Sequence, residues 1–599
     1  MKKSFYALAL LMTPYAIGAF AEEADLKVTV TASRFEQNIA EIGSSVTILD
    51  KETLEKRGDR SVADALKRVQ GVTLSRAGGI GSVSSIRLRG SDQGQVLVLI
   101  DGIDVGDPAS IDGSYDFDSL LVSTVERIEI IRGNQSALYG SKAIGGVINI
   151  ITHKTVKDGV SGTAFAEAGS FGTKQGGFNI AAGDEDMSFY VNATHLDRDG
   201  FSRAASGNEN DSTEDTNING GLTLRPTDNI ELGANGGYIH LDAEIDGFPS
   251  PSFVLADTED ESEKDFYFGN IYANVSAFDG RLDNRLTLGG SRTERDSSGS
   301  SFDGDRFEAI FQSNLKLRQR DVLSLGADYD IETAETSNID ADVESKSIYG
   351  QYLLGLGQNI TLTLGGRIDH FDNFGSNETY RAGIAYVIPE SMTTIRGTYG
   401  TGFKAPTLFQ LFSPSFGNTN LNPEESKGFD FGFEQTFPGE YVTIGATYFE
   451  TEIDNLIGFT SGYVNINEAE ISGWETFIEI DPTDSLSIYA NYTYTDAMDI
   501  TNNTQLLRRP KHQAAFGADI DITEDFRFGV QGLFVGEQQD RFNVSNSSFF
   551  TADINTAYGL TENVELYARA DNILDRDYQE VVGYNAPGIS AYGGLRVRF

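Results

Sequence analysis

The feature that most constrains the fold of this chain is a two-residue alternation of apolar and polar side chains that continues from about residue 158 to the C-terminus. Segments 442–449, 486–495 and 564–571 each place mostly apolar residues at every second position and mostly polar residues between them. Successive side chains of a β-strand point to opposite faces, so this period predicts strands with one apolar and one polar face. Such strands suit either a half-buried sheet or the wall of a membrane barrel with a wet interior.

Short polar turns recur along this region at 226–228, 482–484, 523–525 and 561–563. Two strands of about 10 residues joined by a tight turn leave a longer connection at the opposite end. The sequence predicts such connections at 205–217, 246–265, 296–305 and 412–422. About 440 residues at about 40 per hairpin give about eleven hairpins, or 22 strands, and a barrel of that width needs a filling for its lumen.

Residues 35–155 follow a different pattern. A short helix is expected over 59–66 with Ser61 as a possible cap, and apolar runs at 96–100 and 146–152 predict buried strands. Mixed helix and buried strand in about 120 residues describe a small α+β domain of the right size to sit inside a barrel.

The N-terminus has the layout of a secretory signal. Lys2 and Lys3 precede an apolar stretch that ends in Ala19-Phe20-Ala21, which resembles a cleavage site. A membrane anchor helix is the alternative, but the stretch is short and Pro14 interrupts it. We expect a signal peptide at 1–21, an N-terminal extension at 22–34, a plug domain at 35–155 and a barrel at 156–599.

The composition excludes several classes of function. The chain has no cysteine, so no disulfide stabilises it, and its formal net charge of -43 would repel nucleic acid. Its five histidines are scattered without a metal-ligand spacing, and no nucleophile motif is present. We therefore expect that the protein is not an enzyme.

Several motifs resemble those of the TonB-dependent receptors of Gram-negative outer membranes. In chain order they are Asp64-Ala65-Leu66, Ser85 to Gly90, Val98 to Gly102, Glu126 to Gly133, Ser136 to Gly140 and Gly145 to Thr152. Each is modest alone, but their order and spacing are specific. The resemblance implies a 22-stranded antiparallel transmembrane β-barrel with an N-terminal α+β plug domain in its lumen. It also implies a monomer in the outer membrane, surrounded by lipid and lipopolysaccharide.

Within that family, three barrel segments resemble the cobalamin receptors more particularly. They are Leu506 to Lys511, Asp571 to Tyr578 and Val582 to Tyr584. This likeness implies TonB-dependent active transport of cobalamin or a related corrinoid.

The resemblance also implies an energy handle and an anchorage for the plug. The segment after the signal resembles the TonB box, which would add as a strand to the TonB protein; its residues are Leu26, Lys27, Val28, Thr29, Val30, Thr31 and Ala32. A disordered leader is the alternative. Two plug arginines would be buried against barrel carboxylates rather than solvated in the lumen; the four residues are Arg89, Arg132, Asp430 and Glu475.

Ligand and cation sites follow from the same likeness. Two plug loops, 77–84 and 110–117, would face outward beneath the ligand, although both could be ordinary surface turns. The candidate ligand contacts are Ala77, Gly78, Gly79, Gly81, Ser82, Ser110, Asp112, Gly113, Ser114, Tyr115 and Asp116. Cobalamin receptors order two outer loops with calcium held by carboxylates; the candidates here are Glu209, Asp211, Asp246 and Asp257. The acidic run 257–261 is equally typical of a solvated loop.

Two other functions remain open at this point. A receptor for a ferric siderophore or haem would share the same motifs, but haem receptors of this type place a histidine in the segment that corresponds to 407–421, which has none. A passive porin or adhesin would need neither the plug motifs nor the TonB-box segment.

The box assignment predicts the effect of a single substitution. Val28→Pro removes a backbone donor and restricts the chain, so it should abolish ligand uptake by cells while ligand binding persists. Normal uptake by the variant would contradict the assignment.

Overall fold

The computed structural model describes residues 29–30, 34–35, 37–152, 156, 158–251, 253–466, 468–541 and 544–599, with the backbone alone at Thr29 and Val30. The proposed signal peptide and most of the proposed TonB box lie outside these residues.

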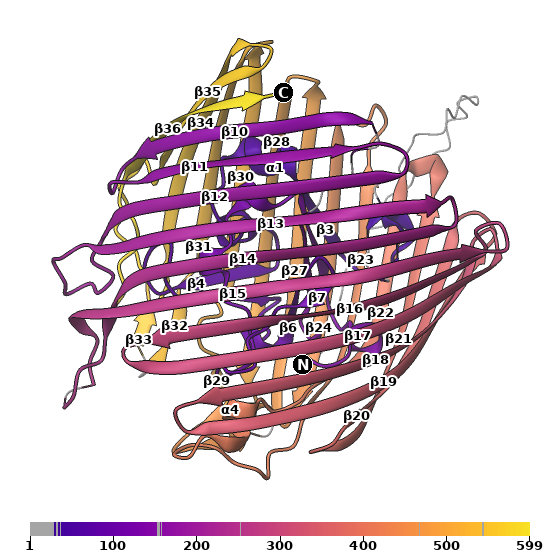
Figure 1. Cartoon of the computed structure of the whole chain (residues 1–599), viewed down its shortest axis with the longest axis horizontal. Coiled ribbons are helices and arrows are strands. Elements are labelled where there is room, and N and C mark those ends of the chain that lie inside the picture. The colour runs from indigo at the N-terminus through magenta and orange to yellow at the C-terminus, as the bar shows by residue number, and fades with distance from the viewer. Residues whose placement is uncertain are drawn as a thin grey trace, which may run out of the picture.

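Twenty-two antiparallel strands close into a barrel, as the alternation predicted (Figure 1). The last strand pairs with the first, from Thr163 opposite Arg598 to Gly169 opposite Tyr592. The strands are β10 (Gly159–Gly169), β11 (Lys174–Gly183), β12 (Met187–Phe201), β13 (Asp211–Thr227), β14 (Ile230–Gly247), β15 (Ala256–Ala277), β16 (Leu282–Ser297), β17 (Ser300–Arg318), β18 (Asp321–Thr336), β19 (Ile339–Leu356), β20 (Ile360–Phe371), β21 (Gly375–Ile388), β22 (Thr393–Lys404), β23 (Glu424–Thr436), β24 (Val442–Asp454), β27 (Glu468–Thr483), β28 (Leu486–Asp499), β30 (His512–Thr523), β31 (Phe526–Val535), β34 (Phe549–Thr561), β35 (Val564–Asp571) and β36 (Ser590–Arg598).

The two rims of the barrel differ in their connections. At the inner rim, which carries the start of β10 and the end of β36, the strands are joined by short turns, one of which holds η5 (Pro389–Ser391). The outer rim carries the longer connections, and barrels of this kind turn such loops to the cell exterior. These connections contain α4 (Leu408–Phe412), β25 (Ile457–Phe459), β26 (Tyr463–Asn465), β29 (Thr504–Gln505), β32 (Gln538–Asp540) and β33 (Val544–Asn546).

Some outer connections are shorter than the sequence predicted. The predicted loop at 296–305 is wrong, because β16 and β17 continue to a two-residue turn at 298–299. Likewise β13 begins at Asp211 and β15 at Ala256, within the predicted loops at 205–217 and 246–265. The charged residues of these segments belong to strands that extend beyond the apolar part of the wall.

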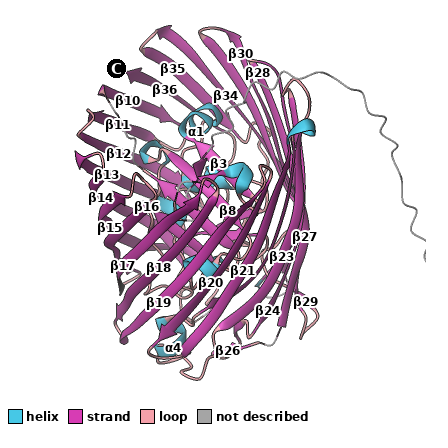
Figure 2. Ribbon diagram, turned by 90° about the vertical axis from the view of Figure 1, so that its right-hand side faces the viewer, coloured by secondary structure: helices cyan, strands magenta, loops and turns pink. Residues whose placement is uncertain are grey.

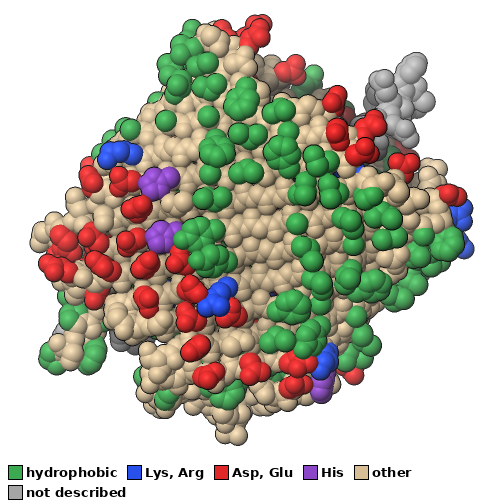
Figure 3. Space-filling model, in the orientation of Figure 1, with side chains coloured by type: hydrophobic (Ala, Val, Ile, Leu, Met, Phe, Trp, Pro, Cys, Tyr) green, Lys and Arg blue, Asp and Glu red, His purple; other side chains and the backbone are tan. Residues whose placement is uncertain are grey.

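Large apolar side chains are exposed on the outside of strands from β10 to β36 and form an apolar belt, one face of which is seen in Figure 3. Its outward side chains include Val191, Ile218, Ile271 and Leu364, all exposed in the isolated molecule. A wall that presents large apolar residues to the outside and polar residues to the lumen suits a lipid surrounding. No helix of the described residues is long and apolar enough to span a membrane.

The lumen holds the N-terminal domain (Figure 2). A five-stranded sheet has the order β3 (Val46–Asp50), β8 (Arg127–Arg132), β9 (Gly146–Ile151), β6 (Val96–Ile100) and β7 (Ile103–Asp104), with β6 and β9 parallel. A separate hairpin joins β4 (Val72–Arg76) and β5 (Ser84–Leu88). The helices are α1 (Lys51–Arg57), α2 (Val62–Leu66) and α3 (Ser136–Tyr139), with single 3-10 turns η1 (Ile39–Glu41), η2 (Gln93–Gln95), η3 (Phe117–Ser119) and η4 (Val122–Thr124).

The core of this domain continues into the barrel wall. Ile100 and Ile148 of the central strands are fully buried, as is Leu66 of α2, and wall residues Ile239 and Phe266 pack in the same cluster. The predicted helix over 59–66 is present as α2, and the Ser61 hydroxyl accepts the Asp64 amide at 3.2 Å. The domain therefore fills the lumen as a packed body.

Candidate functional site

Two buried plug arginines share one carboxylate of the barrel wall. Arg89 donates from Nε and Nη2 to the two oxygens of Glu475 at 2.9 and 2.8 Å, a bidentate pair, and Arg132 Nε lies 3.5 Å from the same carboxylate. Asp430 adds a second carboxylate 3.4 Å from Arg89. All four side chains are at most 6% exposed, so the structure brings together the four residues that the sequence proposed.

A glycine makes room for this carboxylate. Gly71 has a left-handed backbone with a φ of +73°, and a Cβ at this position would lie 2.1 Å from Oε1 of Glu475. Any side chain here would displace Glu475 from Arg89. Gly71, which follows α2 in the chain, is therefore part of the anchorage.

The N-terminal segment is held inside the lumen. Strand β1 (Thr29–Val30) pairs antiparallel with β2 (Gln37–Asn38). Arg34, between them, donates to Asp328 of the wall at 2.9 Å and lies over the ring of Tyr349 at 5.1 Å. The described part of the proposed TonB box is thus already paired within its own chain, and Arg34 fixes it to the barrel.

Two plug loops reach toward the outer rim, and Asp116 ties them together. Its carboxylate accepts the amide of Ser84 at 2.8 Å, which joins loop 110–117 to loop 77–84. The two side chains most exposed in these loops are Val83 at 62% and Ile111 at 56%. The loops therefore present two apolar contacts.

The sequence-predicted contacts in these loops are mostly covered. Those that are buried are Gly78, Gly79, Gly81, Ser82, Gly113 and Tyr115; those half-buried are Ala77, Ser110, Asp112, Ser114 and Asp116. Sequence reasoning missed Val83 and Ile111 as candidate contacts. Part of the signal was present, since each is an aliphatic residue in a predicted loop rich in Gly and Ser. The first loop also holds Ile80, which is buried, so sequence alone did not single out Val83.

An outer connection borders the second loop. The Thr407 hydroxyl, at the start of α4, donates to the carbonyl of Ile111 at 2.9 Å. Farther out, Phe416 and Phe459 make an edge contact with ring centroids 5.4 Å apart, and both are exposed. Aromatic side chains thus stand above one side of the plug.

Three of the four proposed calcium ligands converge at the outer rim. Glu209, Asp211 and Asp246 bring their carboxylate oxygens within 4.8 Å of one another. Asp257, on β15, is not in this group. Its carboxylate accepts a hydrogen bond from the backbone amide of Asn208 at 2.9 Å, which places it against the loop between β12 and β13.

The three carboxylates repel one another. Asp211 lies at the outer end of β13, beyond the apolar belt, and burial together with the charge of Asp246 raises its pKa to about 6. Three convergent carboxylates that repel one another fit a hard divalent cation, and Glu209, Asp211 and Asp246 would hold it. Such a cation would neutralise the repulsion and fix the loop between β12 and β13.

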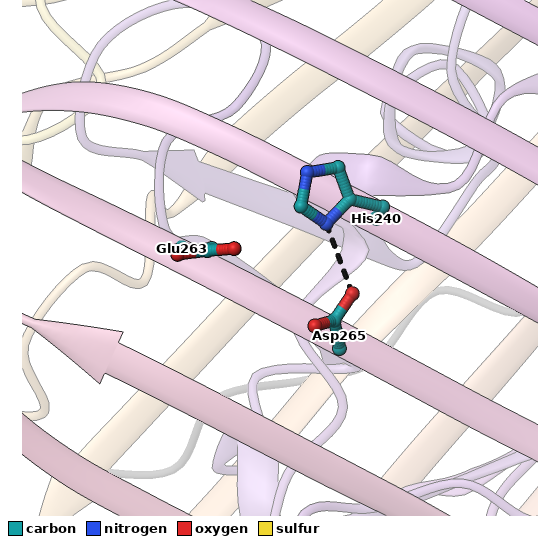
Figure 4. Close-up of side chains that lie close together, drawn as sticks. All are labelled: His240, Glu263 and Asp265. Atoms are coloured by element: carbon teal, nitrogen blue, oxygen red, sulfur yellow. Dashed lines mark hydrogen bonds and ion pairs between the residues drawn. The ribbon is translucent and has the colours of Figure 1, made fainter.

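A second group of possible metal ligands lies on the outer wall. His240 of β14 stands directly opposite Asp265 of β15, with 2.9 Å between Nδ1 and Oδ1, and Glu263 lies beside them (Figure 4). These residues follow the Tyr238 and Tyr267 pair at the edge of the apolar belt. They face outward, away from the plug.

Comparison with known families covers most of the chain. Residues 160–573 match the model described as TonB dependent receptor-like, beta-barrel, and residues 38–147 match the TonB-dependent Receptor Plug Domain. A curated relative, the vitamin B12 transporter BtuB of Photobacterium profundum, is 29% identical over 623 residues, with all of both chains covered.

Solved structures share the architecture. A ferric enterobactin receptor (PfeA) variant from Pseudomonas aeruginosa in complex with enterobactin is 19% identical, with a TM-score of 0.80 over 93% of this chain and 100% of that chain. The siderophore receptor PirA from Acinetobacter baumannii is also 19% identical, with a TM-score of 0.79 over 93% and 98% of the two chains. At this identity the likeness establishes the fold alone.

The shared carboxylate predicts a strong mutational effect. Glu475→Gln leaves two buried arginines without a full counter-charge on that side, so it should destabilise the plug by about 3–5 kcal/mol. A single cysteine introduced at the buried position 63 (Ala63→Cys) reports unfolding of the plug. The measurement is the denaturant concentration at which half of this cysteine becomes reactive. Glu470→Gln, on an exposed side chain of the same strand, is the control. Equal midpoints for the two variants would contradict the role of Glu475.

The Arg34 contact predicts a second effect. Arg34→Ala removes the bond to Asp328, so the β1–β2 pair should open more often and a Thr29→Cys thiol should react several-fold faster with a water-soluble maleimide. The chain has no other cysteine, so the label is specific. Arg318→Ala, on a side chain 81% exposed, is the control. An unchanged rate in Arg34→Ala would show that Arg34 does not hold the segment.

Proposed function

The chain belongs to the TonB-dependent receptors, and we propose that it transports cobalamin or a related corrinoid across the outer membrane of a Gram-negative bacterium. As a member of that family it is a TonB-dependent transporter with a plugged barrel. The identity of the ligand and of the cation is our proposal, as are the outer-membrane location and the absence of catalysis.

The observation that carries the proposal is the convergence of Glu209, Asp211 and Asp246 at the outer rim. Cobalamin receptors, which this chain resembles in sequence, order their outer loops with carboxylate-held calcium. Exposed acidic residues are common, but here three carboxylates from a loop and two neighbouring strands meet at one point. This arrangement supports a calcium site that shapes the ligand-binding surface.

The carboxylates also connect to the plug. Asp211 accepts the backbone amide of Arg203, and Asp246 accepts that of Ala204. The Arg203 guanidinium in turn donates to the carbonyl of Gly81 at 3.0 Å and to Thr213 at 3.1 Å. A cation on the carboxylates would therefore stiffen the same backbone that positions the first plug loop.

The segment 582–584, which resembles the cobalamin receptors, lies against the loop between β12 and β13. The backbone carbonyl of Gly583 accepts a hydrogen bond from the backbone amide of Ala205 at 2.8 Å. The backbone amide of Asn585 donates a hydrogen bond to the carbonyl of Arg203, also at 2.8 Å. Ala204 and Tyr584 form a β-bridge. The 582–584 motif thus contributes to the outer surface at the point where the carboxylates meet.

The plug surface suits a bulky ligand with apolar faces. Val83 and Ile111 offer aliphatic contacts, and exposed Phe416 and Phe459 add aromatic ones on the outer connections. A corrinoid is large and mostly uncharged at its ring periphery, so contact area rather than paired charge would carry its binding. The siderophore receptors of similar fold are too distant in sequence to transfer their ligands to this chain.

Transport would use the N-terminal segment as the handle. The TonB protein would pair with residues 26–32 by strand addition once β1 leaves β2. Force on that strand would then act on the plug, whose anchor is Glu475. Only Thr29 and Val30 of the proposed box belong to the described part of the chain.

Equilibrium binding to the detergent-solubilised full chain tests the ligand and the cation together. We expect cyanocobalamin to bind and ferric enterobactin not to bind, and we expect a chelator or Asp246→Asn to weaken cyanocobalamin binding about tenfold or more. Asp242→Asn, on an exposed residue of the same strand, is the control.

The two parts of this proposal fail separately. Tight binding of the ferric chelate with no binding of cyanocobalamin would overturn the corrinoid assignment. Binding of cyanocobalamin that ignores both chelator and Asp246→Asn would retain the ligand but remove calcium.

A further inference from the structure

A buried arginine beneath the first plug loop has no counter-charge. Arg198 lies on the lumen side of β12 and is 2% exposed. Its guanidinium makes no hydrogen bond or ion pair to any residue that the structure describes, and Nε is fully enclosed without a partner. Its neighbours are two aromatic rings, with the guanidinium carbon 5.4 Å from the centroid of Phe171 and 5.5 Å from that of Phe201.

The charges nearest to Arg198 have the same sign. Its electrostatic neighbours are three arginines that repel it, Arg60, Arg76 and Arg203, and the neutral side chain of Tyr592. Arg60 has its own partner in Asp571 at 3.6 Å, and Arg76 has one in Asp64 at 3.2 Å. Asp571 and Asp64 therefore compensate the charges of Arg60 and Arg76, and neither carboxylate pairs with Arg198. Arg198 thus remains a buried positive charge without a counter-charge.

Aromatic rings compensate such a charge only in part. Contact with a ring face recovers a fraction of the free energy that a guanidinium loses when it leaves water. Several buried arginines of this lumen carry a direct carboxylate partner, as Arg569 does with Glu167 and Arg367 with Asp369. Others have no ion pair but donate to neutral oxygens, as Arg87 does to Ser75 and Arg203 to Gly81. Arg198 has neither kind of partner among the described residues. The position of Arg198 therefore calls for an acceptor that the protein itself does not supply.

Other donors without partners surround the same point. The Ser82 hydroxyl is buried and makes no hydrogen bond, and the amides of Gly78 and Gly79 have no acceptor among the described residues. A Cβ on Gly79 would lie 3.2 Å from Nη1 of Arg198, and one on Gly78 would lie 2.6 Å from Oγ of Ser82. Nη1 of Arg198 therefore lies close to Gly79, and the Ser82 hydroxyl lies close to Gly78, so these donors lie along one turn, 78–82. A water molecule could accept from some of these donors, but it would leave the charge uncompensated.

We propose that Arg198, Ser82 and the backbone of Gly78 and Gly79 form a binding site for a single oxyanion of the phosphate class. Guanidinium groups and successive backbone amides are the donors that proteins use for such groups. The oxyanion is either free inorganic phosphate or the phosphodiester of the transported molecule. The free-phosphate form goes beyond the proposed function, whereas the phosphodiester form rests on it.

Thermal unfolding of the full chain in detergent tests the site without any transported ligand. At equal ionic strength, sodium phosphate should raise the melting temperature of the wild type by about 2 °C relative to a bulky sulfonate buffer. Arg198→Met should abolish this rise. In the sulfonate buffer Arg198→Met should be at least as stable as the wild type, because it removes the uncompensated charge.

Two further variants separate the site from general effects of charge and folding. Arg292→Met removes an exposed arginine of the barrel and should keep the full response to phosphate. Gly79→Ala keeps every charge but presses a methyl group on Nη1 of Arg198, so it should reduce the response.

A pair of corrinoids distinguishes the two sources of the oxyanion. If the ligand supplies it, Arg198→Met should weaken binding of a corrinoid that carries the phosphodiester-linked nucleotide about tenfold and leave a corrinoid without it unchanged. If inorganic phosphate fills the site, Arg198→Met should lose the rise in melting temperature with phosphate. It should then bind both corrinoids with the affinity of the wild type.

Identical behaviour of wild type and Arg198→Met in both measurements would overturn the site. If neither corrinoid binds to the wild type, the proposed function fails, and the phosphate response alone then decides on the oxyanion.

Discussion

The structure depends on one buried carboxylate that two arginines share. Glu475 comes from the barrel wall, whereas Arg89 directly follows β5 of the plug and Arg132 ends β8. Each arginine would be costly without it, so the wall and the plug stabilise each other through the same group. A hydrophobic contact could hold the plug as firmly, but it would not specify a single orientation. The glycine at position 71 shows how closely the plug backbone approaches this point.

The barrel could be predicted from the sequence because lipid and lumen impose opposite demands on neighbouring side chains. The alternation in segments such as 486–495 therefore predicted both the strands and their number. The prediction failed at 296–305, where both faces of β16 and β17 are wet beyond the apolar belt. Charged residues there resemble a loop, and only the pairing of the two strands shows otherwise. Turns of this kind need the register of the sheet, which composition does not reveal.

Candidate site residues were predictable to the extent that they belong to motifs. The motifs Ser85 to Gly90 and Glu126 to Gly133 pointed to Arg89 and Arg132, and the acidic segments pointed to Asp211 and Asp246. Exposure was not predictable, because Val83 and Ile111 differ from buried aliphatic residues only in what covers them. Arg34 and Arg198 were missed for a related reason. An arginine in a sequence is ordinarily solvated, and its importance here comes from burial against residues that are far away in the chain.

The pairing of β1 with β2 has a mechanical consequence. A load applied at the N-terminus first meets two residue pairs, then the Arg34 contact with Asp328, and then β3, the edge strand of the plug sheet. Because these contacts lie one after another along the chain, they resist in series, and each can rupture before the next is strained. The work needed at any moment is that of a few bonds, whereas the same contacts arranged in parallel would have to break together. The order of the chain thus lets a weak, sustained force do what a single strong one would otherwise require.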